Sequence, residues 1–103
     1  MANSIKMRIS KKGDEVIVKA LIKHPMETGR KVDPDTGETI PAHFIQTVIG
    51  EYDGRKVFTA YWGTGVSENP FISFKFKGGE ESKMVKLSWF DNQGASDSLE
   101  VPI

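Results

Sequence analysis

The chain has 103 residues, with 14 lysines and arginines against 14 aspartates and glutamates, and it contains no cysteine. This length predicts a single domain over residues 1–103, large enough to fold around one core without metal or disulfide support. The balanced charge argues against nucleic-acid binding, which needs a basic face for phosphate. The missing cysteine excludes disulfides, thiolate metal sites and cysteine nucleophiles.

Two strands are expected first. Residues 5–10 alternate apolar and polar side chains, which is the period of a half-buried strand. After a turn over residues 11–14, the run 15–23 is rich in β-branched side chains and is apolar on both faces at its start, which predicts a central strand. Pro25 then ends the strand, because proline has no N–H to donate to the ladder.

Residues 25–41 predict a long excursion from the domain. They hold three of the five prolines and few large apolar side chains. The stretch Asp33–Glu38 is a strong turn signal, since Pro34 suits the second position of a turn and Gly37 accepts a positive φ. We expect a small polar hairpin here, and a connection of this length is typically a binding loop or a mobile one.

Five more strands are expected, over residues 44–52, 56–62, 71–77, 84–90 and 96–101. Asp53-Gly54 is the best hairpin signal, between the first two. In the first of these strands the alternation places Phe44 and Val48 on one face and Ile45 on the other. In the fourth, Trp89 is expected to be the buried centre of the core.

The predicted fold class is all-β. About seven short antiparallel strands with regularly spaced turns are typical of an immunoglobulin-like β-sandwich, and an open barrel is the competing architecture. No cysteine pair brackets Trp89, so a fibronectin-like variant is favoured over an antibody-type domain.

The loop over residues 61–71 contains two glycines and a proline, which exclude a regular element, and it has aromatic residues at both ends. We expect a shaped loop that is pinned to the core. Trp62 and Phe71 either plug the end of the sandwich or form an interface with another protein, where aromatic residues are enriched.

Candidate metal ligands are few. His24 and Met26 are close together on an irregular loop, but His43 is distant in sequence and no third strong ligand is evident. A soft copper-type site can be imagined from these residues. The simpler interpretation is a pair of loop histidines hydrogen-bonded to backbone, and we expect no metal.

Catalytic groups are also missing. The acidic pairs Asp33/Asp35 and Glu80-Glu81 sit in turns, where carboxylates serve turn geometry and solubility. Ser67 lacks the closing glycine of a nucleophile elbow, and no helix follows residues 63–65 to present its N-terminus to a phosphate. We therefore expect neither an enzyme nor a bound cofactor.

The N-terminus lacks the basic and apolar regions of a secretory signal, and no apolar run approaches the roughly 18 residues that a membrane helix needs. We expect a protein that does not bind membranes and that either stays in the cytoplasm or is carried out of it by something else.

Five segments resemble the successive motifs of the SoxZ family, in order and spacing over essentially the whole chain. They are residues 24–29 (HPMETG), 40–45 (IPAHFI), 62–71 (WGTGVSENPF), 76–79 (FKGG) and 91–98 (DNQGASDS). SoxZ is the small subunit of the SoxYZ carrier of bacterial sulfur oxidation.

The resemblance implies an immunoglobulin-like subunit without catalytic residues that forms a heterodimer with SoxY. In this family SoxY carries thiosulfate-derived sulfur on a cysteine near the end of a flexible arm, and other periplasmic sulfur-oxidation enzymes meet the carrier transiently. A chain without cysteine fits the Z role. The resemblance also implies a periplasmic location reached by co-export with SoxY, which carries the signal.

We expect eight residues in or next to loops to contact SoxY or to steady its arm: His24, Met26, His43, Phe44, Trp62, Val66, Asn69 and Phe71. Two alternatives stay open. One is a β-sandwich interaction module that forms homodimers, and the other is a metal-binding domain that uses the histidines and Met26.

Overall fold

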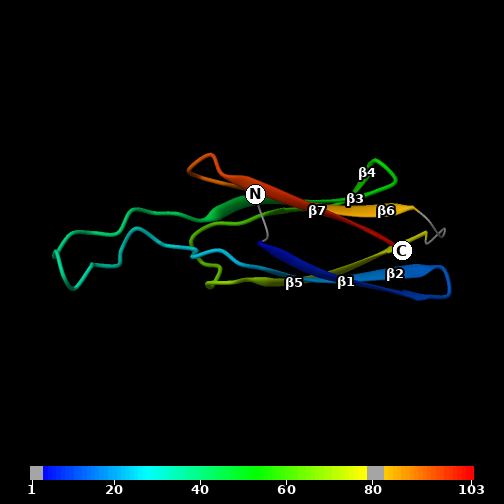
Figure 1. The fold of residues 1–103 in the computed structure, drawn as a ribbon, viewed down its shortest axis with the longest axis horizontal. Coiled ribbons are helices and arrows are strands. Elements are labelled where there is room, and N and C mark those ends of the chain that lie inside the picture. The colour runs from blue at the N-terminus through cyan, green and yellow to red at the C-terminus, as the bar shows by residue number, and fades with distance from the viewer. Residues whose placement is uncertain (1–3, 79–82) are drawn as a thin grey trace.

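The computed structural model describes residues 4–78 and 83–103, and it shows two antiparallel sheets packed face to face (Figure 1). The seven strands are β1 (Ile5–Lys12), β2 (Glu15–Ile22), β3 (Ile45–Tyr52), β4 (Arg55–Tyr61), β5 (Phe71–Lys77), β6 (Met84–Asp91) and β7 (Ser96–Pro102). One sheet has the order β1-β2-β5 and the other β4-β3-β6-β7. This arrangement confirms the predicted immunoglobulin-like β-sandwich.

Two of the sequence-based expectations concern residues that the description leaves out. The start of the chain, residues 1–3, and most of the predicted turn over residues 78–82, including Glu80-Glu81, lie outside the described residues. Within residues 4–78 and 83–103, no helix is long and apolar enough to cross a bilayer.

The predicted hairpin between β3 and β4 is confirmed. Asp53 and Gly54 both adopt positive φ, of 51° and 79°. Positive φ at both central residues is the geometry of a type I′ turn, whose twist matches that of the two strands it joins. Glycine is suited to the second position because it has no Cβ to clash in this conformation.

The alternation predicted for the start of β3 is wrong. Ile45 and Val48 are both fully buried, although the simple alternation places them on opposite faces. The cause is an irregularity in the pairing with β6, where Ile45 lies opposite Asp91 and Thr47 opposite Phe90. One extra residue, Gln46, stands between them, and this β-bulge turns Ile45 back toward the core.

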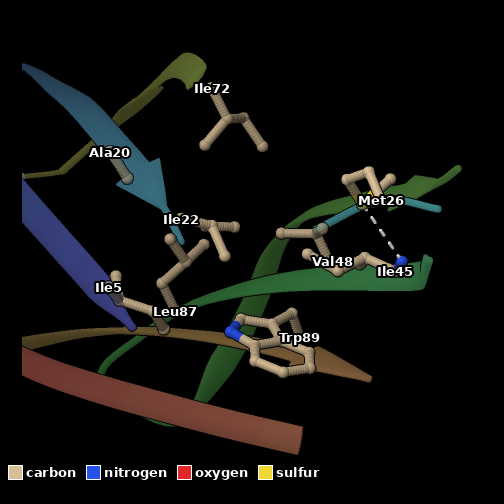
Figure 2. Packing of buried hydrophobic residues seen from close by; sticks show 9 residues of the cluster. All are labelled: Ile5, Ala20, Ile22, Met26, Ile45, Val48, Ile72, Leu87 and Trp89. Carbon is tan, nitrogen blue, oxygen red and sulfur yellow. Dashed lines mark hydrogen bonds between the residues drawn. The ribbon is translucent and has the colours of Figure 1, made fainter. Parts of the chain in front are cut away.

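The larger core cluster lies between the sheets toward one end of the sandwich (Figure 2). Its buried members are Ile5, Ala20, Ile22, Met26, Ile45, Val48, Ile72, Leu87 and Trp89. Trp89 is only 6 % exposed, as predicted. A smaller cluster of Val16, Val18, Tyr52 and Val85 fills the other end. Full burial of each aliphatic side chain contributes about 1.5–3 kcal/mol.

Gly50 leaves space for two stacked aromatic rings. The rings of Phe58 and Phe74 stack with centroids 4.3 Å apart. A Cβ added at Gly50 would lie 2.8 Å from Cζ of Phe74 and 3.3 Å from Cβ of Phe58. The missing side chain of β3 therefore makes room for the stacked pair.

The excursion between β2 and β3 projects from the sandwich as a narrow hairpin (Figure 1). We call residues 28–42 the finger. Isolated bridges join Val32 to Thr39 and, at the base of the finger, Glu27 to His43. Gly37 N–H donates to the carbonyl of Asp33 at 2.8 Å and closes the turn at the tip. The expected polar hairpin is confirmed.

Candidate functional site

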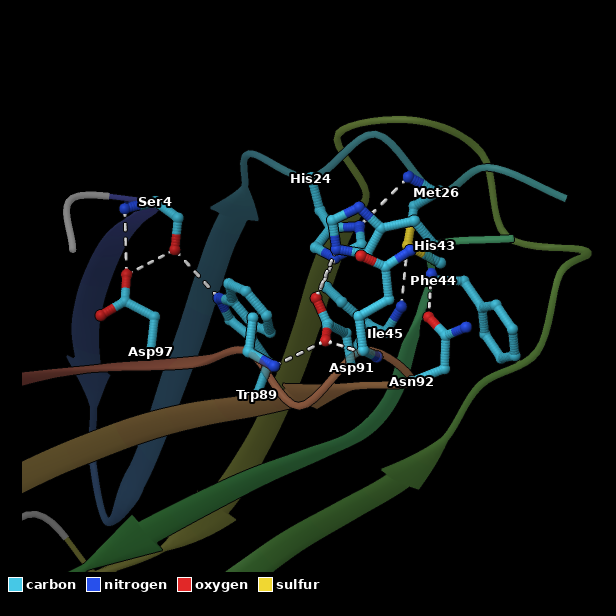
Figure 3. Close-up of polar contacts among 12 residues, drawn as sticks. Ser4, His24, Met26, His43, Phe44, Ile45, Trp89, Asp91, Asn92 and Asp97 are labelled. Atoms are coloured by element: carbon cyan, nitrogen blue, oxygen red, sulfur yellow. Dashed lines mark hydrogen bonds and ion pairs between the residues drawn. The ribbon is translucent and has the colours of Figure 1, made fainter. Parts of the chain in front are cut away.

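Four segments meet at the end of the sandwich from which the finger projects, and we call this region the loop end (Figure 3). It comprises residues 23–27, 42–44, 62–70 and 91–95. These segments come from both sheets, and hydrogen bonds between them replace the strand pairing that stops here.

Asn69 joins the 62–70 loop to the end of β2. The amide of His24 donates to Oδ1 of Asn69 at 3.0 Å, and the amide of Asn69 donates to the carbonyl of His24 at 2.9 Å. Asn69 has a φ of 52°, a left-handed conformation that asparagine tolerates better than most residues. The amide of Ile22 adds a bond to the carbonyl of Pro70 at 3.0 Å. The loop is therefore shaped and pinned, as predicted.

The centre of the loop end is a carboxylate shared by both histidines of the chain. Oδ2 of Asp91 lies 2.9 Å from Nε2 of His24 and 2.7 Å from Nε2 of His43. The side chains of Asp91 and His24 are 0 % and 2 % exposed, whereas that of His43 is 30 % exposed. The expectation that the histidines lack a strong third partner is wrong, because folding brings Asp91 from β6 between them.

The second carboxylate oxygen of Asp91 organises its own turn. Oδ1 accepts the amide protons of Gln93 at 3.0 Å and Ala95 at 2.8 Å. Burial by itself raises the pKa of Asp91, but the hydrogen bonds from His24, Ala95, His43 and Gln93 outweigh it and leave the pKa below its ordinary value. Asp91 is therefore a buried carboxylate with four donors around it.

The tautomer of His24 follows from its neighbours. The amide of Met26 donates to Nδ1 of His24 at 3.1 Å, so that nitrogen carries no proton. The single ring proton then sits on Nε2 and is donated to Asp91. The ring of His24 also packs edge-on against Trp89, with centroids 5.1 Å apart. These contacts fix the orientation and the tautomer of the His24 ring.

A metal ion would have to compete with this arrangement. His24, His43 and Asp91 offer ligand atoms that all lie within 4.8 Å of one another, and two imidazoles with one carboxylate suit several transition metals. However, coordination through Nε2 of His24 moves its proton to Nδ1, where it would face the amide proton of Met26. Metal binding therefore costs a buried hydrogen bond, and the donor set fits a hydrogen-bonded support better than a metal centre.

Asn92 extends the support to the base of the finger. Its Oδ1 accepts the amide proton of Phe44 at 2.8 Å, and its Nδ2 donates to the carbonyl of Ala42 at 3.0 Å. Nε2 of Gln93 donates to the same carbonyl at 3.0 Å. The β6–β7 turn thereby fixes the strand of the finger that leads into β3.

A second polar network closes the neighbouring edge of the sandwich. The hydroxyl and the amide of Ser4 both donate to Oδ2 of Asp97, and Nε1 of Trp89 donates to the hydroxyl at 2.9 Å. Burial by itself raises the pKa of Asp97, but the hydrogen bonds from Ser4 and Ser98 outweigh it and leave the pKa below its ordinary value. These bonds tie the start of β1 to β6 and β7 in the other sheet.

The eight residues expected to bind a partner divide into three groups. His24 and Met26 are buried, and they bond to Asp91 and to the amide of Ile45 under the loops. His43, Phe44, Trp62 and Val66 are half-buried, and the last three pack against the core cluster. Asn69 and Phe71 are exposed.

Trp62 thus fits the expectation of a plug at the sandwich end, whereas Phe71 does not. Phe71 is 62 % exposed and points outward at the start of β5. Tyr61, at the end of β4, is 81 % exposed.

Asp91 and Asn92 were missed by the sequence-based analysis of sites. Two signals were present: both histidines flank one excursion, and an acidic residue followed by Asn-Gln-Gly ends a strongly apolar strand. Such Asx residues commonly organise turns by accepting backbone protons.

Comparison with protein-family models gives a match over nearly the whole chain. A family model described as "Sulphur oxidation protein SoxZ" matches residues 5–102. A search of curated proteins found no significant match.

Proposed function

The chain belongs to the SoxZ family of the sulfur-oxidation system, and we propose on this basis that it is the non-catalytic subunit of the SoxYZ carrier. In this role it binds SoxY and supports it while the C-terminal cysteine of SoxY carries covalently bound sulfur intermediates during thiosulfate oxidation. The heterodimer works in the periplasm, which this subunit reaches together with SoxY, and it meets other sulfur-oxidation enzymes there transiently.

The loop end is the structural observation that supports this proposal. The chain has no cysteine, so it cannot hold sulfur through a thiol of its own. What it offers instead is a set of loops from both sheets that are fixed by the buried Asp91 cluster. A partner with a mobile arm needs a preorganised base, because rigid contact surfaces lose less entropy on binding.

We propose that the exposed and half-buried members of the predicted set contact SoxY. These are His43, Phe44, Trp62, Val66, Asn69 and Phe71. His24 and Met26, which are buried, act on the partner through the loops that they hold in place.

Co-purification with tagged SoxY tests the proposal. The unmodified chain should elute with SoxY as a stable pair. A Trp62→Ala/Phe71→Ala variant should bind SoxY about 10-fold more weakly or worse, because truncation of an aromatic anchor typically costs ~2 kcal/mol or more.

The matched control is Tyr61→Ala, which removes an aromatic side chain that is 81 % exposed at the end of β4 and is not among the eight predicted contact residues. This control should bind SoxY like the unmodified chain. A double variant that has the circular dichroism spectrum of the unmodified chain and still binds SoxY fully would refute the assigned contact. A chain that forms homodimers and does not bind SoxY would refute the proposed role as a subunit of the SoxYZ carrier.

A further inference from the structure

The outer face of the β1-β2-β5 sheet is strongly basic. The outward positions are Lys6, Arg8, Ser10 and Lys12 on β1, Glu15, Ile17, Lys19 and Leu21 on β2, and Phe71, Ser73, Lys75 and Lys77 on β5. Six of these side chains are basic, and Glu15 is the acidic one. The whole chain has no net charge, so this sheet face concentrates positive charge that is balanced elsewhere.

The basic side chains near the loop end are not neutralised by the chain itself. Arg8 lies directly opposite Lys19 in the ladder between β1 and β2. Like charges in directly opposite positions destabilise a sheet. Among the described residues of this face, Lys75 and Glu15 form an ion pair, with Nζ and Oε2 3.8 Å apart. Lys6, Arg8 and Lys19 have no acidic partner within 4 Å in this part of the chain.

An apolar groove lies among these charges. It has a volume of about 310 Å³, and its walls include Lys6, Arg8 and Lys19 together with Leu21 and Phe71. Leu21 and Phe71 are neighbours across the β2–β5 ladder and are 40 % and 62 % exposed. The groove therefore offers an apolar contact surrounded by three cations.

We propose that this basic face is a docking surface for an acidic protein segment. The segment places an apolar side chain against Leu21 and carboxylates beside Lys6, Arg8 and Lys19. A carboxylate next to Arg8 and Lys19 offsets the repulsion between these two cations, and this favours binding. A phosphate backbone would use the charges but not the apolar groove, and Phe71 is the one aromatic side chain on this face that could stack on a base.

The chemistry of the face also indicates a transient partner, distinct from a permanent subunit. Permanent interfaces are more hydrophobic than transient ones, whereas this face is mostly charged. Complementary charge instead speeds encounter and makes binding sensitive to salt. The inference therefore goes beyond the proposed pairing with SoxY and assigns this face to a second, reversible partner.

Nuclear magnetic resonance titration of the ¹⁵N-labelled chain tests the proposal. The probe is the peptide Glu-Glu-Leu-Phe-Glu-Glu at low salt, and its control is the same peptide with lysine in place of glutamate. The acidic peptide should shift the amide signals of Lys6, Lys19, Leu21 and Phe71. Binding should weaken several-fold when salt rises from about 20 to about 200 mM, because the charges are exposed and screened.

Two charge-reversal variants complete the experiment. Lys6→Glu/Lys19→Glu should weaken binding of the acidic peptide at least 10-fold. The matched control Arg55→Glu/Lys56→Glu reverses two exposed charges on β4 and should leave binding unchanged. All four side chains are exposed, and dispersed amide spectra confirm that each variant is folded.

Several results would overturn the proposal. They are equal binding by the Lys6→Glu/Lys19→Glu variant, equal binding of the lysine peptide, shifts confined to other faces, and absence of any shift at millimolar peptide. Tighter binding of a single-stranded oligonucleotide, an anionic vesicle or free sulfate than of the acidic peptide would assign the face to another ligand. Co-purification of Lys6→Glu/Lys19→Glu with SoxY reports separately on the proposed carrier role, which this variant should retain.

Discussion

Replacing Asp91 by asparagine tests whether the shared carboxylate holds the loop end together. The asparagine amide is nearly the same size as the carboxylate but has one acceptor oxygen and one NH₂ group. With its oxygen toward Gln93 and Ala95, its NH₂ group faces the Nε2 protons of His24 and His43. With the amide reversed, the NH₂ group faces two backbone N–H groups, so either orientation places donors against donors.

The tautomer of His24 makes this conflict hard to relieve. His43 can move its proton to Nδ1 and accept from the amide, but Nδ1 of His24 already accepts the amide proton of Met26. At least one buried donor therefore loses its acceptor, at a site where the side chains of His24 and Asp91 are 2 % and 0 % exposed. An unsatisfied buried polar group costs about 1–3 kcal/mol, and loss of a charged partner costs more.

We expect Asp91→Asn to lower the free energy of unfolding by about 2–4 kcal/mol. For a domain of this size such a loss lowers the melting temperature by roughly 10 °C or more. Urea unfolding monitored by tryptophan fluorescence suits the test, because Trp89 packs against His24.

The control is Asp35→Asn in the exposed turn of the finger, which should change the free energy of unfolding by no more than about 0.5 kcal/mol. A loss below about 0.5 kcal/mol for Asp91→Asn, with an unchanged denaturant slope, would refute the structural role of the cluster.

Three further predictions concern acid, metal and the aromatic pair. The folded-state pKa values of Asp91 and Asp97 lie below the ordinary value of 3.8, so their stabilisation is complete above the unfolded pKa and is lost as pH falls through the folded values. Acid unfolding followed by circular dichroism below about pH 4 should therefore be less steep for Asp91→Asn, and an unchanged steepness would contradict the assignment. Equimolar Zn²⁺ should leave the melting temperature unchanged, whereas a clear rise that Asp91→Asn abolishes would show that the histidine cluster binds metal. Gly50→Ala should cost about 1–3 kcal/mol in urea unfolding, because its Cβ meets the ring of Phe74. The control Gly63→Ala, which meets nothing within 4 Å, should cost much less, and equal costs would contradict the packing argument.

Much of the fold could be predicted because its signals are local. The turn at Asp53-Gly54 and the burial of Trp89 each depend on a few neighbouring residues, and both predictions are confirmed. The β-bulge at Gln46 breaks the alternation that the sequence predicts for the start of β3. It could not be predicted, because the extra residue is defined by the pairing of β3 with β6. A local pattern carries no information about that pairing.

The candidate site was only partly predictable for a related reason. His24 and His43 were both candidate residues, but the sequence did not place them together, and Asp91 is 67 residues from His24 in sequence. Their contact exists only when both sheets have packed and the β6–β7 turn lies over the finger base. The resemblance to the SoxZ family marked all three segments, yet it did not show that they meet around one carboxylate.

Sedimentation velocity of this chain with and without purified SoxY tests the central claim most directly. The account predicts a heterodimer with one copy of each subunit, formed at micromolar concentration and absent when either protein is alone. A chain whose sedimentation is the same with and without SoxY, as monomer or as homodimer, would contradict it.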